Sequence, residues 1–173
     1  MLILKDWPHA PSTAEGPEVP GLPPSGPLPD DSSLLAKITS NTPPQRAAAL
    51  RLTEEARKLL EAGDASRALG RLERSIAIDS ANGYAYYFLA KAHNKLGRQK
   101  ESLNFLDVAE ARLAGEPFWL SEVHALRGEN FRTLGMTERA DASFSKALSI
   151  NSGNRTATEA MTRATSNPAP GPR

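Results

Sequence analysis

The sequence predicts an all-α protein in which a helix–turn–helix unit is repeated three times and the units stack into a superhelix, or solenoid. Apolar residues recur at the three- and four-residue spacing of a helix throughout residues 42–165. Gly63, Gly97 and Gly135 each follow such a pattern, and glycine readily takes the left-handed conformation that ends a helix. Of the 14 prolines, ten lie in residues 1–44 and three in the last six residues, so the middle is free to be helical.

The first 41 residues differ in composition and are expected to form a disordered, proline-rich arm. They are rich in Pro, Gly, Ser and acidic residues and offer few side chains for a core. Such a chain favours an extended conformation and acts as a semi-rigid spacer. A second interpretation is a ligand for a proline-binding domain, because residues 20–23 and 24–27 have the PxxP spacing. The folded domain is then expected over residues 42–165, and residues 166–173 are expected to be a disordered tail.

Charge and cysteine content exclude several kinds of site. Residues 1–42 hold two Lys against five acidic residues, whereas residues 43–163 hold 18 Lys or Arg against 15 acidic residues. This balance lacks the clustered basic face of a nucleic-acid-binding domain, so no nucleic acid is expected as a partner. The absence of cysteine excludes disulfides, thiolate metal sites and cysteine nucleophiles. No apolar run approaches the roughly 20 residues that span a membrane.

The helices of the domain are marked by start and stop signals. The first is expected over residues 42–62, where Thr42 is a suitable N-cap and Gln45 can complete a capping box. Asp64 is expected to cap the second helix, and Asn154 is expected to cap the last one. The other helices are expected over residues 83–96, 99–113, 118–134, 137–150 and 155–164.

The three glycine stops lie 34 and 38 residues apart, which points to a repeat. The segments GDASRALGRLERSIAIDSAN and GMTERADASFSKALSINSGN share Gly, Arg, Ala, Ile, Ser and Asn in register. Two helices in 34 residues is the period of the tetratricopeptide repeat, and the chain resembles that family. The resemblance implies repeats over residues 49–82, 83–116 and 121–154, with an insertion of about four residues before the third and a capping helix at residues 155–164.

Small and large residues follow the packing pattern of this family. Small residues that let helices approach are Ala56, Ala90, Gly128, Ala68, Ser102 and Ala140. Large residues that fill the core between neighbouring repeats are Leu72, Leu106 and Phe144. The closing proline of the family is missing in all three repeats. The match covers about 115 residues, and three repeats with a cap suffice for a stable stack.

The resemblance implies a concave groove, lined by the first helix of each repeat, in which family members hold a peptide or a partner helix. The groove positions carried over to this sequence are Arg57, Glu61, Tyr84, Tyr87, Lys91, Asn94, Lys95, Glu122, Glu129 and Arg132. Four of them, from Tyr87 to Lys95, share one helix face by their spacing. An aromatic floor with amide and ammonium donors suits an extended peptide backbone or a carboxylate. The alternative is that the tyrosines are packing residues and the lysines are solvated.

A chaperone-tail receptor is not expected. The carboxylate clamp of the family uses particular Asn and Lys residues, and Arg57 stands where an Asn belongs. An enzyme is not expected either, because the sequence has no HExxH, no phosphate-binding glycine loop and no Ser/His/Asp signature. His93 and His124 occupy expected packing positions, so no metal or other cofactor is expected.

The sequence is therefore interpreted as a non-catalytic scaffold that binds a peptide or a partner protein. A second hypothesis is a structural subunit that self-associates, as a homo-oligomer, through its repeats or through residues 114–120, where Phe118 and Trp119 would be outer aromatics. The alanine-rich, cysteine-free style resembles small bacterial repeat proteins, many of which act in envelope assemblies. By that analogy alone, the bacterial periplasm or cell envelope is favoured over the cytoplasm if an upstream signal exists.

Overall fold

The computed structural model describes residues 26–166, and over that range the secondary structure is entirely helical. The helices are η1 (Leu35–Lys37, a 3-10 helix), α1 (Pro44–Glu61), α2 (Ala65–Ile78), α3 (Gly83–Lys95), α4 (Gln99–Arg112), α5 (Pro117–Thr133), α6 (Thr137–Ile150) and α7 (Arg155–Ser166). The all-α fold class is confirmed, and the helix bounds lie within two residues of those predicted. The part of the predicted arm over residues 1–25 and the tail after residue 166 lie outside the described residues.

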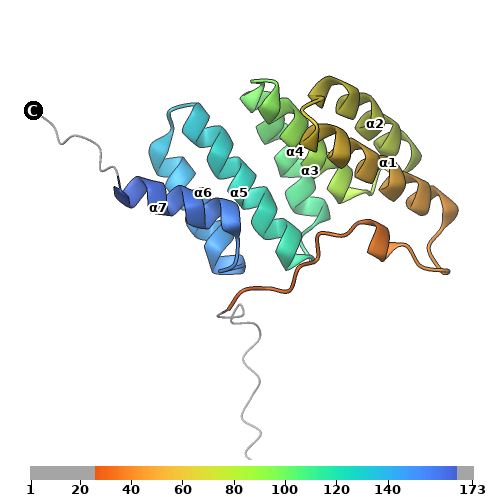
Figure 1. Cartoon of the computed structure of the whole chain (residues 1–173), viewed down its shortest axis with the longest axis horizontal. Coiled ribbons are helices and arrows are strands. Elements are labelled where there is room, and N and C mark those ends of the chain that lie inside the picture. Colours follow the sequence, from red (N-terminus) through yellow and green to blue (C-terminus); the bar gives the residue numbers. More distant parts are fainter. Residues whose placement is uncertain (1–25, 167–173) are drawn as a thin grey trace, which may run out of the picture.

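The helices form consecutive pairs that stack side by side into a curved array (Figure 1). The pairs are α1 with α2, α3 with α4, and α5 with α6, and α7 closes the far end. This is the predicted solenoid of three units and a capping helix. None of the helices within residues 26–166 is long and apolar enough to cross a membrane.

The first helix of each pair ends in the same way. Gly63, Gly97 and Gly135 have φ values of 85°, 74° and 76°, which are left-handed. At the first of these turns the amide of Asp64 donates to the carbonyl of Leu59 at 2.8 Å, and the other two turns repeat this bond. Such bonds satisfy carbonyl groups at the helix end, so all three glycine stops predicted from the sequence are confirmed.

The helix starts are less uniform than the stops. Asp64 and Asn154 act as the predicted N-caps, because their side chains accept from the amides of Arg67 and Ala157. The prediction for α1 is wrong: Pro43 is its N-cap residue and no side chain caps it. The hydroxyl of Thr42 instead accepts from the amide of Thr39, which tightens the turn before the helix.

Two buried apolar clusters hold the stack together. The larger joins helices α1 to α5, and the smaller joins α5, α6 and α7. The predicted filling residues Leu72, Leu106 and Phe144 have no exposed surface. Gly128 is required by close approach, since a Cβ atom there would lie 2.6 Å from Cε1 of Phe144. The predicted alternation of small and large residues therefore sets how closely α5 approaches α6.

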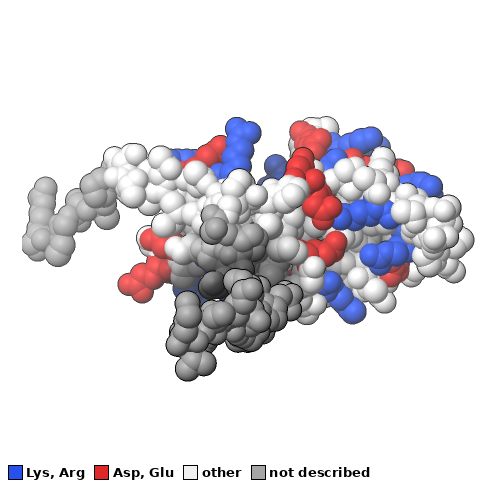
Figure 2. Space-filling view, turned by 90° about the horizontal axis from the view of Figure 1, so that it is seen from below, with Lys and Arg blue, Asp and Glu red and all other residues white. Residues whose placement is uncertain are grey.

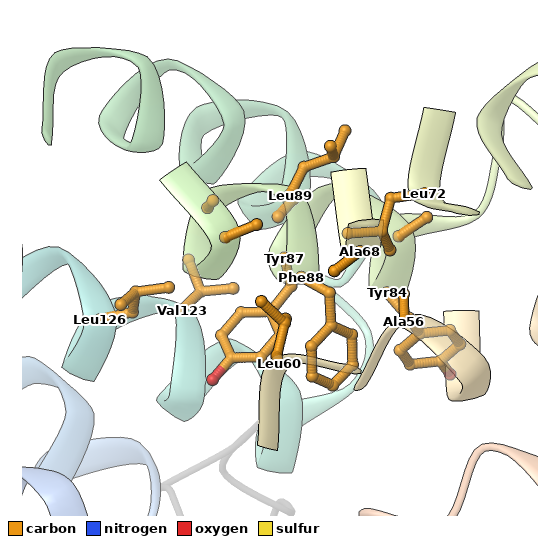
Figure 3. Packing of buried hydrophobic residues seen from close by; sticks show 14 of the residues in the cluster. Ala56, Leu60, Ala68, Leu72, Tyr84, Tyr87, Phe88, Leu89, Val123 and Leu126 are labelled. Carbon is orange, nitrogen blue, oxygen red and sulfur yellow. The ribbon is translucent and has the colours of Figure 1, made fainter. Parts of the chain in front are cut away.

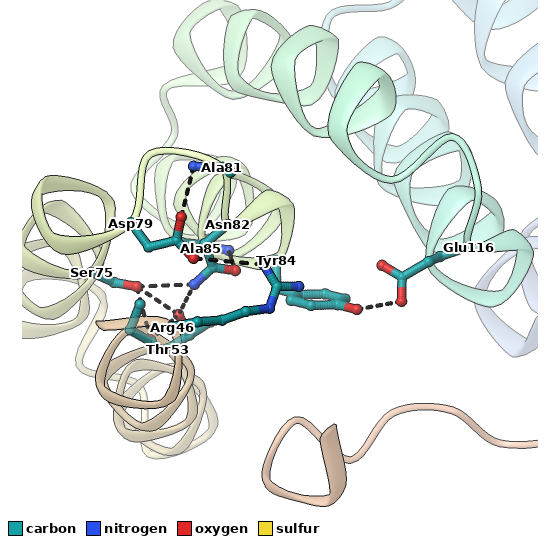
Figure 4. Close-up of polar contacts among 10 residues, drawn as sticks. Arg46, Thr53, Ser75, Asp79, Ala81, Asn82, Tyr84, Ala85 and Glu116 are labelled. Carbon is teal, nitrogen blue, oxygen red and sulfur yellow. Dashed lines mark hydrogen bonds and ion pairs between the residues drawn. The ribbon is translucent and has the colours of Figure 1, made fainter. Parts of the chain in front are cut away.

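A buried polar network joins the first repeat to the second (Figure 4). The Asn82 side chain donates to the hydroxyls of Thr53 and Ser75, both at 3.1 Å. Those two hydroxyls each donate to the Ala49 carbonyl at 2.8 Å. Asn82 also caps α3 by accepting from the amide of Ala85. One side chain thus ties together α1, α2 and the start of α3.

Residues 26–41 differ from the predicted disordered arm, because they pack on the domain. Leu34 is completely buried in the larger apolar cluster. The indole Nε1 of Trp119 donates to the Asp31 carbonyl at 3.1 Å, and the amide of Leu28 donates to Asn151 Oδ1 at 2.9 Å. These contacts, more than 80 residues apart in sequence, offset the low helical and core-forming potential of the segment.

Candidate functional site

The first helices of the three repeats share the lining of a pocket of about 460 Å³. Arg57 and Glu61 of α1, Lys91 of α3 and Glu122 of α5 all contribute to it. A second pocket of about 200 Å³ lies between α3 and α5 and shares Tyr87, Lys91, Lys95 and Glu122 with the first. We call these two adjoining pockets the groove. It follows the repeat because every unit presents its first helix to the same side.

The groove contains most of the residues carried over from the family resemblance. Those that line it are Arg57, Glu61, Tyr87, Lys91, Asn94, Lys95, Glu122 and Glu129. Tyr84 and Arg132 lie outside its lining. The Tyr84 hydroxyl donates to the carboxylate of Glu116, and the guanidinium of Arg132 lies over the ring of Phe144 at 4.6 Å.

The aromatic floor of the groove is mostly buried. Figure 3 shows the rings of Tyr87 and Phe88 beside Leu60 of α1, with Val123 and Leu126 of α5 nearby. Tyr87 and Phe88 are 4% and 3% exposed, respectively. Burial also raises the pKa of the Tyr87 phenol well above its usual range. The tyrosine therefore serves mainly as packing, and only the edge of its side chain is offered to a ligand.

Two ammonium groups stand out among the polar residues of the groove. Lys91 and Lys95 lie four residues apart on α3 and therefore share one face. Within residues 26–166, neither lysine has a carboxylate oxygen within 4.0 Å. Their donors are thus available to acceptors on a ligand. The amide of Asn94 is engaged, since its Nδ2 donates to Asn130 Oδ1 at 3.0 Å.

The opposite wall of the groove carries two carboxylates on α5. Burial raises the pKa of Glu122, and the charge of Lys91 partly opposes that rise. Loss of water around its carboxylate also raises the pKa of Glu129, although part of this residue is exposed. Asn154 Nδ2 donates to Glu122 Oε1 at 2.9 Å, which fixes the orientation of the Glu122 carboxylate. The groove thus pairs an ammonium wall with a carboxylate wall.

Arg57 is already occupied by the protein. It donates to Glu54 Oε1 at 2.7 Å and to the Ser32 carbonyl at 3.0 Å, and it lies 3.8 Å from a carboxylate oxygen of Glu61. This arginine was predicted as a ligand-binding residue. The structure shows that its guanidinium holds the segment before η1.

Sequence reasoning missed one wall of the larger pocket. Asp30 and Ser32 line it from the segment before η1, and Asn151, Gly153 and Arg155 line it from the turn before α7. The first group was missed because residues 1–41 were expected to be disordered. The second was missed because the capping helix was expected only to close the stack.

The expectation that Trp119 is an outer aromatic residue is wrong. Its side chain is 3% exposed and packs edge-on against Tyr84, Tyr87 and Phe88, with ring centroids 5.1, 5.6 and 5.9 Å apart. Trp119 lies in the first turn of α5, and its indole packs on the aromatic rings of α3. Trp119 is therefore not available for the predicted self-association through residues 114–120.

Charges of both signs are interspersed over the described part of the face seen in Figure 2. Lys and Arg side chains alternate there with Asp and Glu side chains rather than forming one basic field. A ligand that meets this face and the groove would encounter both donors and acceptors.

Comparison with protein families gives two matches inside the domain. Two family models, both described as tetratricopeptide repeat, match residues 59–128 and residues 121–154. Among curated proteins, no sequence matches the chain.

Several solved structures share the fold at low identity. The second tetratricopeptide-repeat domain of human RPAP3, in complex with the HSP70 peptide SGPTIEEVD, is 22% identical, with a TM-score of 0.60 over 70% of this chain and 98% of that one. The Arabidopsis OM64 domain is 20% identical, with a TM-score of 0.61 over 69% and 95%. The Yersinia enterocolitica secretion chaperone SycD, in complex with a peptide of the translocator YopD, is 15% identical, with a TM-score of 0.55 over 67% and 86%.

At these identities the solved structures show a shared fold. The family models add the repeat itself: one match, residues 121–154, coincides with the third repeat, and the other, residues 59–128, includes the whole of the second. The chain belongs to the tetratricopeptide-repeat family.

Proposed function

We propose that this protein is an interaction scaffold that binds an extended peptide segment of a partner protein in the groove. One observation carries the proposal: Lys91 and Lys95 line a preformed pocket, and neither forms an ion pair within residues 26–166. Ligand pockets of proteins combine an apolar floor with a few polar groups that fix orientation. The floor here is formed by Phe88 and Leu60, and the polar groups are the two lysines with Glu122 facing them.

Similar folds support this proposal. The RPAP3 domain and SycD were solved with peptides, and both resemble this chain over about two thirds of its length. The groove offers an extended peptide ammonium donors on one side and carboxylate acceptors on the other. The proposed ligand therefore presents backbone carbonyls or acidic groups toward α3, and amides or basic groups toward α5. An envelope setting rests on analogy alone, and the sequence encoded upstream of Met1 tests it.

The proposal is tested with peptides selected on the full-length chain from a displayed random library. The affinity of the selected peptides is then measured for the wild type and for a Lys91→Ala/Lys95→Ala variant. We expect the variant to bind at least about tenfold more weakly, because it loses charge-assisted hydrogen bonds of about 1.5–3 kcal/mol each.

The matched control is Lys100→Ala/Lys146→Ala, which removes two exposed lysines that do not line the groove. This variant should bind like the wild type. Equal affinity of all three proteins for the selected peptides would show that the groove is not their binding site.

A further inference from the structure

The segment before η1 contacts the groove as a bound peptide would. We call residues 28–34 the strap. Its main chain is held at three points: the Leu28 amide donates to Asn151 Oδ1 at 2.9 Å, the Asp31 carbonyl accepts from Trp119 at 3.1 Å, and the Ser32 carbonyl accepts from Arg57 at 3.0 Å. The partners belong to three separate parts of the stack, so the strap spans it. Contacts of this kind recognise an extended backbone and not a particular side chain.

The strap also has one side chain that acts as an anchor. Leu34 is completely buried in the larger core cluster, whereas the adjacent Leu35 is 46% exposed. The Asp31 carboxylate is paired with Lys37 of η1 at 2.8 Å. Selectivity for a side chain is therefore concentrated at a single position, two residues after the carbonyl that Arg57 holds.

The strap covers space that a groove ligand would use. Asp30 and Ser32 form one side of the 460 Å³ pocket whose other sides carry Lys91 and Glu122. Two residues of that pocket, Arg57 and Trp119, donate hydrogen bonds to main-chain carbonyls of the strap. A ligand that lies along the full groove meets the strap and competes for these two donors.

We propose that the strap is an internal ligand of the groove, and that the partner segment is an extended peptide with a leucine-like anchor two residues after a carbonyl held by Arg57. This inference rests on the proposed function of the groove. Binding of the partner peptide displaces the strap. The tethered strap therefore lowers the apparent affinity of the groove for the partner peptide. A short tether gives an effective concentration of about millimolar, which a partner must overcome.

The test uses a synthetic, fluorescently labelled peptide of residues 27–37 and three full-length proteins: wild type, Leu34→Ser and Leu35→Ser. The two substitutions make the same chemical change at a buried and at an exposed leucine. We expect the peptide to bind the Leu34→Ser chain at least about tenfold more tightly than the wild type, because its own strap no longer competes. The Leu35→Ser chain should behave like the wild type, and a peptide that itself carries Leu34→Ser should not bind.

Equal binding of the peptide to all three folded proteins, or binding to none, would overturn the inference and make the strap a fixed part of the fold. Circular dichroism establishes that each variant is folded. If Leu34→Ser unfolds the chain, Leu34→Ala replaces it. A second measurement then follows Trp119 emission in a Trp7→Phe background, where Trp119 is the sole indole. Excess peptides selected on the groove should change that emission in the Trp7→Phe chain with its strap unaltered, and no change would count against displacement.

The outcomes separate this inference from the proposed function. Suppose that the selected peptides lose affinity in the Lys91→Ala/Lys95→Ala variant but bind wild type and Leu34→Ser equally. This result supports the proposed function of the groove and refutes the proposal that the strap competes for it. If the affinity of the selected peptides does not change on the lysine substitutions, the proposed function of the groove is refuted. Binding of the strap peptide to Leu34→Ser alone would then show only that the strap can dissociate.

Discussion

The two junctions between repeats are built differently. At the first, between α2 and α3, the 34-residue period is kept, and Asn82 joins three helices through buried hydrogen bonds. At the second, between α4 and α5, the period is 38 residues and the N-cap residue Glu116 makes no side-chain capping bond. Its carboxylate instead accepts from Tyr84, while Trp119 fills the space between the repeats. The second junction also contains a buried asparagine, but it lies within α5: Asn130 Nδ2 donates to Ser102 Oγ at 2.8 Å, and Asn130 Oδ1 accepts from Asn94 at 3.0 Å. The first junction is therefore held by an asparagine at a helix cap, and the second by an asparagine inside a helix together with a buried indole.

The junction before the capping helix shows which arrangement belongs to the repeat. There Asn154 donates to Ser121 Oγ at 2.9 Å and caps α7, just as Asn82 does for α3. At the second junction the cap residue is Glu116, the buried asparagine lies further along α5, and the indole of Trp119 donates to the strap. The additional residues of the longer period lengthen α5, which has 17 residues against 13 in α3, and Trp119 lies in its first turn.

The largest effect is expected from Trp119→Ala at the second junction. The substitution removes a buried indole that packs on three aromatic rings of α3 and on Phe118, and should lower the free energy of unfolding by about 3–5 kcal/mol. Urea unfolding followed by circular dichroism measures the loss. Phe118→Ala, at a half-buried neighbour, is the control and should cost clearly less. Similar losses for both would mean that packing at this junction does not depend on the indole.

Asn82→Ala should weaken the first junction, with an intermediate loss of folding stability. The substitution removes a cap and the donor to two buried hydroxyls, so a loss of about 1–3 kcal/mol is expected. Asn154→Ala should cost a similar amount, because its network is equivalent. Thermal unfolding of both variants provides the measurement. A negligible loss in both would contradict the role given to the asparagine networks.

Glu116→Ala should have a small effect, which sharpens the contrast between the junctions. This residue is the sequence counterpart of Asn82 at the second junction, but its contacts with Tyr84 and Lys37 are partly exposed. We expect less than about 1 kcal/mol, as for other exposed ion pairs. Urea unfolding in parallel with Asn82→Ala makes the comparison direct. If Glu116→Ala costs as much as Asn82→Ala, the contacts of Glu116 stabilise the second junction as much as those of Asn82 stabilise the first.

The smallest effect is a pH dependence from Glu122 in the groove. Burial raises the pKa of its carboxyl above the ordinary 4.5, so its contribution to stability is fully present below that pH and is lost as the pH rises through the folded pKa. In the Glu122→Gln variant the side chain at this position is an amide that stays neutral at every pH. The variant should therefore be slightly more stable than the wild type at pH 7, and the difference should vanish toward pH 4.

Melting temperatures across this pH range test the prediction. Glu138→Gln, an exposed residue of α6 outside the groove, should not change the profile. A Glu122→Gln variant that is less stable than the wild type at pH 7 would show that the ionised carboxylate stabilises the groove.

Some misjudged residues share one cause. Tyr84 was expected in the groove because the family's groove positions were carried over to it, but its hydroxyl donates to Glu116. Trp119 was expected on the outside because an insertion is usually a surface loop, yet its indole is buried. In both cases a neighbour from a distant part of the chain decides the burial of the side chain.

The sequence by itself determined the helices, their stops and the order of the repeats, because those depend on local spacing, on glycine conformations and on the size of single side chains. The family resemblance also named residues that line the groove, such as Lys91 and Glu122, since the repeat places the same side of each first helix there. Only the tertiary structure decided that Arg57 is engaged by the strap, that Trp119 points inward and that Leu34 is buried. The contacts of Arg57 and Trp119 with the strap join residues 25 and 88 positions apart, which no local pattern encodes.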